Sequence, residues 1–355
     1  MSAIHGTLVA LGARVLDTVH GEFVVHAFRN LVTREHVLAV ARGDVTTAEP
    51  LLARIHSSCV TSESYGSGDC DCAQQLDAAL ARVARAGRGI VFYLMQEGRG
   101  AGFVAKARDR MLVQASGNRL TTFDAYAQMG LSEDGRRYDD VGFACRLLGV
   151  TAPLALLTNN PGKLAAVEAT GVRIATVLPL REAPSPLNVQ YLAAKSRSGH
   201  ALPDAATAAA PLPAPVACVD PAPLPEAPQL LHVASYLLPV LAGGAAQRAP
   251  HWFWLHAYLD RASGREHVVL AYGSPGASAL VRVQPVPLLE RFMVRSGGPH
   301  RRRWDAAVRT FVGHGSGCAL LEPLDDVTPG AAPATADATV SALLARQLGG
   351  RRARP

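Results

Sequence analysis

The stretch CAQQLDAALARVARAGRGIVFYLMQEGR, residues 72–99, indicates the fold class because it reads as a helix, a buried strand and a polar turn in immediate succession. Apolar residues recur at helical spacing over 74–86, and Gly87 ends that helix. Residues 89–94 are continuously apolar, which is typical of a strand covered on both faces. A helix that leads into a buried strand predicts an α/β fold, and the polar turn over 96–99 places the chemistry where the strand ends.

Further elements on both sides of this stretch predict a mixed sheet with flanking helices. Strands are expected over 23–28, 36–41 and 51–56. Helices are expected over 104–114 and 139–148, and a strand over 154–157 that runs into the polar turn 158–163. The polar residues of the chain thus gather in loops at strand ends.

The composition changes after residue 200, and a chain of 355 residues is long for a single core. Residues 201–228 are rich in Ala and Pro, which favours a semi-stiff extended linker. We therefore predict a catalytic domain over 1–200, the linker, a smaller α/β C-terminal domain over 229–326 and a flexible tail over 327–355.

The C-terminal domain reads as a degenerate copy of the N-terminal strands. His256-Ala257-Tyr258 followed by 265–273 echoes His26-Ala27-Phe28 followed by 34–43, at an offset of 230 residues. At this offset Leu289 takes the position of Cys59. A second match, of Asp305 with Asp77, gives an offset of 228, at which Gly298 and His300 take the positions of Cys70 and Cys72. We therefore expect no zinc site in the copy, which would pack against the first or mimic a subunit. Chance similarity of two Val- and Ala-rich strands is the alternative.

The overall composition points to a globular protein with an anionic small-molecule partner. Hydrophobic residues make up 49% of the chain and charged residues 18%, enough apolar side chains for a packed interior. The net charge of +6 comes without a long basic run interleaved with aromatic residues, which argues against nucleic acid. Neither a signal peptide nor a membrane span is recognisable, so we expect a cytoplasmic protein with no membrane partner.

Three of the six cysteines lie within fourteen residues, in the spacing C-x10-C-x-C formed by Cys59, Cys70 and Cys72. Three thiolates suit zinc, and catalytic zinc generally keeps three protein ligands and an open position for water. Such a water has a pKa of about 7 and supplies hydroxide at neutral pH. A structural site completed by His56 or another histidine, or three merely buried cysteines, remain alternatives on spacing alone.

Five separated motifs lie around these cysteines: Arg54-Ile55-His56-Ser57-Ser58-Cys59, Cys70-Asp71-Cys72-Ala73-Gln74-Gln75-Leu76, Gln96-Glu97-Gly98-Arg99, Leu147-Leu148-Gly149-Val150 and Leu156-Leu157-Thr158-Asn159-Asn160-Pro161-Gly162-Lys163. Together they resemble the GTP cyclohydrolase II family. The resemblance ends near the segment Tyr191-Leu192-Ala193-Ala194-Lys195 and Gly199-His200, so it covers roughly the first two hundred residues.

The resemblance implies a zinc-dependent hydrolase that opens the imidazole ring of GTP. Formate and pyrophosphate leave, and the product is a diaminopyrimidinone ribosylamino phosphate of riboflavin biosynthesis. Cys59, Cys70 and Cys72 are then the zinc ligands, one zinc ion is bound per catalytic domain, and Mg²⁺ accompanies the nucleotide. The family also implies a homodimer.

The same resemblance assigns roles to individual residues. Asp134 and Arg136 match a pair that acts at the phosphates, where Arg136 would stabilise transition-state charge. Glu97, with Gly98 and Arg99, would read the guanine. The remaining substrate contacts are implied at Arg54, His56, Ser57, Ser58, Gln75, Thr122, Thr158 and Lys163, with Thr121 as an alternative to Thr122.

Three positions depart from the family pattern. Arg110 stands at the catalytic position of a family tyrosine, Ser58 replaces a glutamate, and Asp69 replaces an arginine. A changed charge beside the ring alters proton transfer, which is worth about 10²–10⁴ in rate. A reaction that retains the formyl group, a different purine nucleotide as substrate, and a non-catalytic nucleotide-binding regulator are therefore the alternatives.

Overall fold

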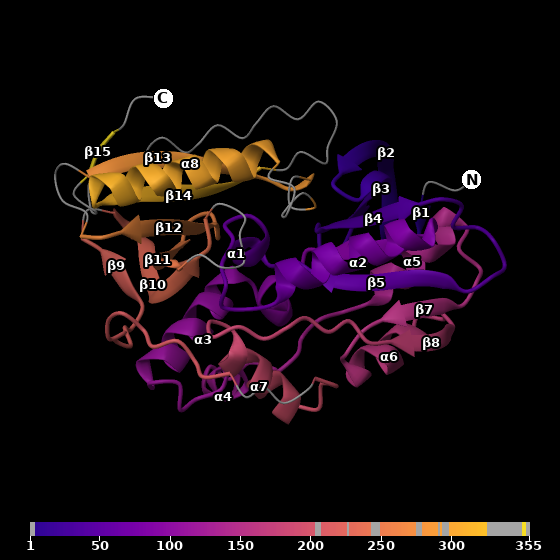
Figure 1. Ribbon diagram of the computed structural model, residues 1–355, viewed down its shortest axis with the longest axis horizontal. Coiled ribbons are helices and arrows are strands. Elements are labelled where there is room, and N and C mark those ends of the chain that lie inside the picture. The colour runs from indigo at the N-terminus through magenta and orange to yellow at the C-terminus, as the bar shows by residue number, and fades with distance from the viewer. Residues whose placement is uncertain are drawn as a thin grey trace.

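The computed structural model describes residues 4–202, 207–225, 227–242, 249–274, 279–289, 292, 298–324 and 350–352. Two mixed sheets, each with flanking helices, form the molecule (Figure 1). The mixed α/β architecture with a smaller second α/β part is therefore as predicted.

The first sheet has the strand order β1-β2-β3-β4-β6-β5-β7-β8. Neighbouring strands in the series β1-β2-β3-β4-β6 are antiparallel, whereas neighbouring strands in the series β6-β5-β7-β8 are parallel. The bounds are β1 Ile4–His5, β2 Leu8–Thr18, β3 Gly21–Asn30, β4 His36–Arg42, β5 Leu51–Ser57, β6 Gly89–Leu94, β7 Leu154–Leu157 and β8 Ile174–Leu178.

Strand β6 is buried on both faces, as its continuous apolar sequence predicts. Val91 and Tyr93 pack with the apolar stripe of α2, Cys72–Ala86, on one face. Ile90 and Phe92 pack on the other face with α5, Asp139–Leu148. Helix α6, Pro161–Glu168, contributes Val167 to the same second layer. The alternation of side chains along one strand thus separates the two layers of helices.

The parallel strands β5, β6 and β7 bring their carboxyl ends to one edge of the sheet, where ligands bind in open α/β sheets. The loop after β5 contains the short helix α1, Val60–Glu63, and the loop after β6 contains the 3₁₀ helix η1, Glu97–Gly100. Three more helices cover this edge: α3 Phe103–Ala115, α4 Thr122–Gln128 and α7 Val189–Arg197.

The second sheet has the order β9-β10-β11-β12-β14-β13-β15, which repeats the order of the first from β1 to β7. Its elements are β9 Ala222–Leu224, β10 Ala227–Val240, β11 His251–Asp260, β12 Glu266–Tyr272, β13 Ala279–Pro287, α8 Pro299–His314, β14 Gly317–Leu324 and β15 Gly350–Arg352. Helix α8 connects β13 to β14 as α2 connects β5 to β6. We call β9–β15 with α8 the C-terminal copy, and the remainder the catalytic copy.

The pairing register also repeats. Ala27 pairs with Leu38 in the first sheet, and Ala257 pairs with Val268 in the second, both 230 positions later. A β-bulge interrupts β2 between Ala10 and Gly12, and another interrupts β10 between His232 and Ala234. Two sheets that share order, register and bulge position are far more alike than chance similarity of strand composition produces.

One detail of the sequence comparison is wrong. The identical tripeptides Arg34-Glu35-His36 and Arg265-Glu266-His267 are not structurally equivalent but are offset by one residue. The equivalent hydrogen bonds that close the two hairpins show this: Asn30 N donates to Glu35 O, and Asp260 N donates to Arg265 O. Arg34, with φ of 62°, is therefore equivalent to Gly264, with φ of 70°. The geometry of the turn, and not the identity of the residues, therefore defines which positions of the two copies are equivalent.

The linker and tail predicted from composition differ from the structure in part. Strand β9 and the start of β10 lie inside the range 201–228, and Val216 is buried in the core of the C-terminal copy. Alanine and proline can extend along a surface and still pack, which composition does not reveal. Within the tail, 350–352 form β15 beside β13, and the rest of 327–355 lies outside the described residues.

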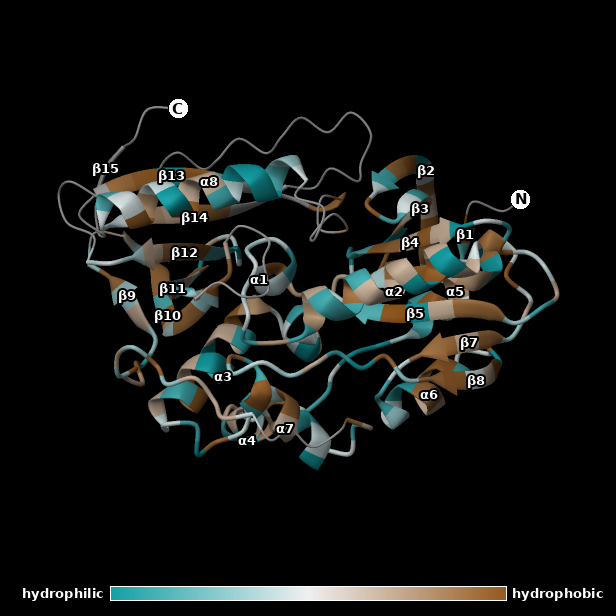
Figure 2. Cartoon of the chain, in the orientation of Figure 1, coloured by the Kyte–Doolittle hydropathy of each residue, from teal (hydrophilic) through white to brown (hydrophobic). Residues whose placement is uncertain are grey.

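The largest hydrophobic core joins the two copies. Tyr65 and three residues of α3, Phe103, Ala107 and Met111, share one cluster with β10, β11 and α8 of the C-terminal copy. Figure 2 shows many hydrophilic residues on the visible side of α8, while its buried residues, such as Trp304 and Phe311, face that core. Among the described residues, no helix is long and apolar enough to cross a membrane.

Candidate active site

All seventeen residues that the sequence assigns to metal, substrate or catalysis line one pocket at the carboxyl edge of the parallel strands. Eleven further residues line the same pocket: Gln96, Lys106, Asp109, Phe123, Tyr126, Asn159, Asn160, Tyr191, Lys195, His200 and Leu202. Side chains from β5, the loop after β6, α3, α7 and the loop after β7 therefore converge on one place.

The three cysteines meet at the floor of this pocket. Cys59 is the N-cap of α1, Cys70 lies in the loop before α2, and Cys72 begins that helix. Their sulfur atoms all lie within 4.8 Å of one another, and the Cys59 and Cys70 sulfurs are 3.7 Å apart. Among the described residues this is the group of His, Cys, Asp and Glu side chains arranged to share a metal ion.

The donor set fits zinc. Two thiolates at a Zn–S distance of about 2.3 Å in a tetrahedral site lie about 3.8 Å apart, which the Cys59–Cys70 spacing matches. No fourth cysteine, histidine or carboxylate completes the group within the described part of the chain, as in catalytic zinc sites with an open position.

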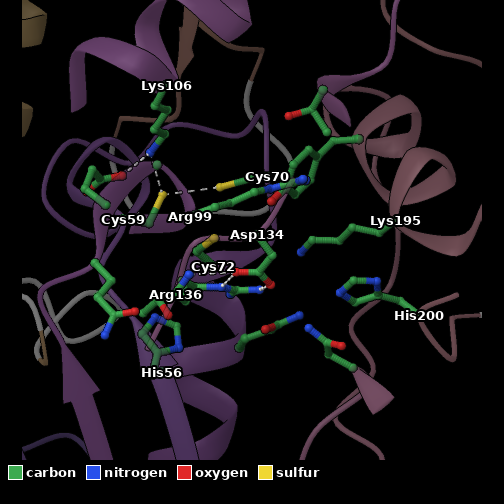
Figure 3. A pocket seen from close by; sticks show the side chains of 18 of the residues that line it. His56, Cys59, Cys70, Cys72, Arg99, Lys106, Asp134, Arg136, Lys195 and His200 are labelled. Carbon is green, nitrogen blue, oxygen red and sulfur yellow. Dashed lines mark hydrogen bonds and ion pairs between the residues drawn. The ribbon is translucent and has the colours of Figure 1, made fainter. Parts of the chain in front are cut away.

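Charges around the sulfurs favour a thiolate at Cys59. Hydrogen bonds from the Cys70 and Cys72 thiols, together with the Lys106 ammonium, lower the pKa of Cys59. Lys106 Nζ lies 3.1 Å from the Cys59 sulfur (Figure 3). Although burial opposes it, the charges of Cys59 and Glu97 raise the pKa of Lys106, so this lysine stays protonated. A fixed cation beside a thiolate is the environment of a metal-binding cysteine.

Glu97 belongs to the same charge cluster. Its Oε1 accepts from Lys106 Nζ at 2.6 Å, and its Oε2 accepts from the backbone N–H of Val60 at 2.9 Å. Burial raises the pKa of this carboxyl, and Lys106 opposes the shift. Oε2 thus holds the loop after Cys59 and Oε1 holds Lys106 of α3, and each oxygen retains a further lone pair for a substrate N–H.

A second buried carboxylate, that of Glu63, holds the backbone of Cys59 in place. Glu63 accepts from the backbone N–H of Cys59 at 3.0 Å and from the Tyr93 hydroxyl at 2.5 Å, and it contacts His56 Nε2 at 2.9 Å. Burial lowers the pKa of His56, although Glu63 opposes the shift. His56 therefore packs into this network and is not part of the metal-ligand group.

A chain of polar contacts leads from Arg54 to α7. Arg54 Nη2 donates to Gln75 at 2.5 Å, Gln75 donates to Asp71 at 2.5 Å, and Lys195 Nζ donates to Asp71 at 2.8 Å. Arg54 Nη1 also donates to the carbonyl of Leu157 at 2.8 Å, and burial lowers its pKa to about 10. These contacts hold Arg54 and Lys195 through Asp71, the residue that precedes Cys72.

Asp134 and Arg136 form a bidentate ion pair, with Nε to Oδ1 at 2.7 Å and Nη2 to Oδ2 at 2.5 Å. In Figure 3 Lys195 and His200 point toward this pair from the opposite wall. Burial and the charge of Lys195 lower the pKa of His200 to about 4, so His200 is neutral at neutral pH. The wall formed by Lys195 and His200 is thus basic without depending on a protonated histidine.

Two threonines and a lysine occupy other strand and helix ends. Thr122 donates to Asp109 at 2.9 Å and lines the pocket, whereas Thr121 caps α4 through Asp124. Thr122 and not Thr121 therefore faces the catalytic pocket. Lys163 Nζ donates to the carbonyl of Ile55 at 2.9 Å, and burial followed by the charge of Arg54 lowers its pKa.

The departures Arg110 and Asp69 contact each other. Arg110 Nε lies 3.4 Å from Asp69 Oδ2, and its guanidinium lies 4.6 Å from the centre of the Tyr191 ring. Both charged side chains are nearly buried, with exposures of 11% and 12%. The two departures therefore form one ion pair, of which Arg110 lines the pocket.

Sequence reasoning missed Lys106, Asp109 and Lys195, although a signal was present for Lys106 and for Lys195. Lys106 precedes Arg110 by four residues on one helix, so both share a face. Lys195 lies within the last segment of the family resemblance. With them the pocket lining contains seven basic side chains and three carboxylates. This surplus of positive charge suits an anionic ligand.

Comparison with known proteins agrees with this geometry. A family model described as GTP cyclohydrolase II matches residues 10–179. The GTP cyclohydrolase-2 of Azotobacter vinelandii is 38% identical over 197 residues, which cover 55% of this chain and 93% of that protein. The chain belongs to the GTP cyclohydrolase II family. It is therefore an enzyme of a hydrolase family.

Other matches cover the same part of the chain. The riboflavin biosynthesis protein RibBA of Bacillus cereus is 39% identical over 201 residues, 56% of this chain and 49% of that protein. A solved structure of RibBX, a two-domain 3,4-dihydroxy-2-butanone 4-phosphate synthase from A. baumannii, matches 51% of this chain and 42% of that chain at 15% identity. Its TM-score of 0.28 is too low to add to the family assignment. The family match ends before the C-terminal copy begins.

Proposed function

We propose that this family member hydrolyses the imidazole ring of GTP with zinc held by Cys59, Cys70 and Cys72. Formate and pyrophosphate would leave, giving a diaminopyrimidinone ribosylamino phosphate for riboflavin biosynthesis. The observation that carries this proposal is three sulfur atoms within 4.8 Å of one another, in a pocket with a surplus of basic side chains.

Zinc bound by these thiolates would polarise a water in its open position and lower the pKa of that water to about 7. Three thiolates carry one more negative charge than Zn²⁺ neutralises, and Lys106 lies where it offsets that excess. Glu97 holds Lys106 in place and presents its remaining lone pairs to the N–H groups of guanine.

The phosphates would lie against the basic wall. Arg54, Lys163 and Lys195 each donate to a carbonyl or side chain of the protein, so their positions are fixed before substrate binds. Arg136, held by the two hydrogen bonds that it donates to Asp134, would stabilise charge that develops at phosphorus. Mg²⁺ would accompany the triphosphate.

The test is incubation of the zinc-loaded protein with GTP and Mg²⁺, followed by ultraviolet absorbance and by assays of formate and pyrophosphate. Release of formate and pyrophosphate in equal amounts supports the proposal, whereas GTP that is not consumed contradicts it. A Cys70→Ser variant should lose zinc and activity together. A Cys145→Ser variant is the matched control because Cys145 is buried in the core between α5 and the sheet.

A second candidate reaction opens the ring but retains the formyl group. The ion pair of Arg110 and Asp69 favours it, because a guanidinium held by a carboxylate cannot exchange a proton as a phenol does. Ring opening without formate in the same assay would establish this reaction. Turnover of another purine nucleotide, or binding without turnover, would establish the remaining alternatives. Homodimer formation and cytoplasmic location stay predictions.

A further inference from the structure

The metal loop, defined as residues 60–69 between Cys59 and Cys70, docks onto the C-terminal copy. Gly68 N donates to the Pro239 carbonyl at 2.9 Å, and Leu241 N donates to the Gly66 carbonyl at 2.9 Å. Between these bonds Ser67 and Val240 form an antiparallel bridge. The loop thus pairs with the end of β10 like a short additional strand at its side.

Helix α8 holds the other side of this loop. Trp304 Nε1 donates to the Tyr65 carbonyl at 3.0 Å, and His300 Nε2 lies 3.2 Å from the Ser64 carbonyl. The Tyr65 ring is fully buried and meets the Trp304 ring edge-on at 5.0 Å. Carbonyls and a ring of the metal loop are therefore bound by one face of α8.

Helix α3, which carries Lys106 and Arg110, docks onto the C-terminal copy as well. Gln114 exchanges two hydrogen bonds of 2.8 Å with the backbone of Leu237. Glu266 caps the start of α3 by accepting from the backbone N–H groups of Phe103 and Val104 at 3.3 and 3.0 Å. Both elements that surround Cys59 are thus positioned from outside the catalytic copy.

The face of the C-terminal copy that binds the metal loop is the equivalent of the catalytic face. Strand pairing of Ala53 with Ile90 and of Val281 with Cys318 relates this part of the two copies by 228 positions. The left-handed C-caps Gly87 and Gly315 give the same offset. By that register His300 replaces the ligand Cys72, Trp304 replaces Leu76, and Gln284, which contacts His300 at 3.3 Å, replaces His56.

We infer that the C-terminal copy is a built-in partner subunit in which the former metal-site face has become a clamp for the metal loop, so that zinc affinity at Cys59, Cys70 and Cys72 depends on it. His300 and Trp304 are positioning residues that act through the main chain of the loop. The inference rests on the proposed zinc site, and the docking that it requires is measurable without zinc.

The test uses the full-length chain with the variants Trp304→Phe and His300→Ala. Trp304→Phe keeps an aromatic ring against Tyr65 but removes the N–H that holds the Tyr65 carbonyl. Phe311→Leu is the matched control, because it weakens the same hydrophobic core through a side chain that makes no hydrogen bond to the metal loop. Arg309→Ala, on the exposed part of α8, controls for a change in charge.

Two readouts are independent of activity: hydrogen exchange of peptides that cover the metal loop, and zinc affinity by competition with a chelator. One lost hydrogen bond is worth about 1 kcal/mol, so each clamp variant should weaken zinc binding about fivefold and speed exchange in the loop by a similar factor. Excess zinc should restore turnover in the clamp variants. The two controls should retain the zinc affinity and the loop exchange of the parent chain.

Unchanged zinc affinity and unchanged loop exchange in both clamp variants would overturn the inference. An equal loss in Phe311→Leu at equal stability would also overturn it, since general weakening of the core would then explain the effect. If the parent chain binds no zinc, the proposed function fails, and exchange of the metal-free loop in the four variants alone decides whether the clamp exists.

Discussion

The ion pair between Lys106 and Glu97 gives the sharpest test of how the protein stabilises the thiolate form of Cys59. Lys106 Nζ lies 2.6 Å from Glu97 Oε1 and 3.1 Å from the Cys59 sulfur, and the two side chains are only 11% and 15% exposed. Breaking a buried pair from one side costs about 3–5 kcal/mol because a charge is left without its partner. Glu97 keeps one backbone donor, from Val60, so the lower end applies to Lys106→Met.

The double-mutant cycle then has definite values. We expect Lys106→Met to lower the free energy of unfolding by about 3 kcal/mol. Glu97→Gln should cost about 2 kcal/mol, since the amide still accepts one bond. The double variant should cost about 3 kcal/mol and not the sum of the two, a coupling of about 2 kcal/mol. Denaturant unfolding of the metal-free proteins measures all three.

Zinc affinity should respond to the two single changes with opposite signs. Loss of the Lys106 charge raises the pKa of the Cys59 thiol and should weaken zinc binding about tenfold. Loss of the Glu97 charge removes a repulsion from the thiolates and should leave zinc binding equal or tighter. Additive unfolding energies, or zinc affinities that fall in both single variants, would refute this account of the cluster.

Three further predictions concern the walls of the pocket. Arg136→Lys should lower kcat about 10²–10³-fold with zinc content unchanged, because a lysine cannot form the two bonds to Asp134; steady-state kinetics and metal analysis test this. Asp69→Arg and Arg110→Tyr should each lower turnover and stability, whereas the double variant should recover part of both; full additivity in formate release and unfolding would contradict the pairing. The His200 pKa of about 4 lies below its unfolded value of 6.5, so the unfolded chain binds more protons between these pH values. Stability should therefore fall as the pH drops from 6.5 to 4, and His200→Gln should flatten the dependence in denaturant unfolding at several pH values.

Helices and strands with an uninterrupted periodic pattern of apolar residues were predictable from the sequence. Helix α2 and strand β6 begin and end within two residues of their expected bounds, because Gly87 and the polar turn after Leu94 mark their ends. Strand β2 was not predicted, since its bulge at Gly12 shifts the alternation of apolar side chains by one residue. A pattern of period two cannot be followed across such a bulge.

The site was predictable where motifs lie at strand ends and not where helices from elsewhere cover them. Cys59, Glu97 and Thr158 follow parallel strands directly, so the fold brings them together. Lys195 reaches the pocket from α7 through its bond to Asp71. Such a contact between residues distant in the chain depends on packing, which neither composition nor spacing encodes.

The two copies show how one backbone carries different chemistry. In the catalytic copy the position at the start of the helix after the loop is a thiol, Cys72, which is one of the proposed zinc ligands. In the C-terminal copy the same position is His300, which contacts a main-chain carbonyl of the loop that joins the catalytic cysteines. Because strand order and helix placement are retained, the change from a thiol at Cys72 to an imidazole at His300 puts a contact between the copies at the proposed ligand position. We therefore interpret the replacement of the three cysteines in the C-terminal copy and the docking of the metal loop on it as one structural change, in which the face equivalent to the proposed metal site binds protein.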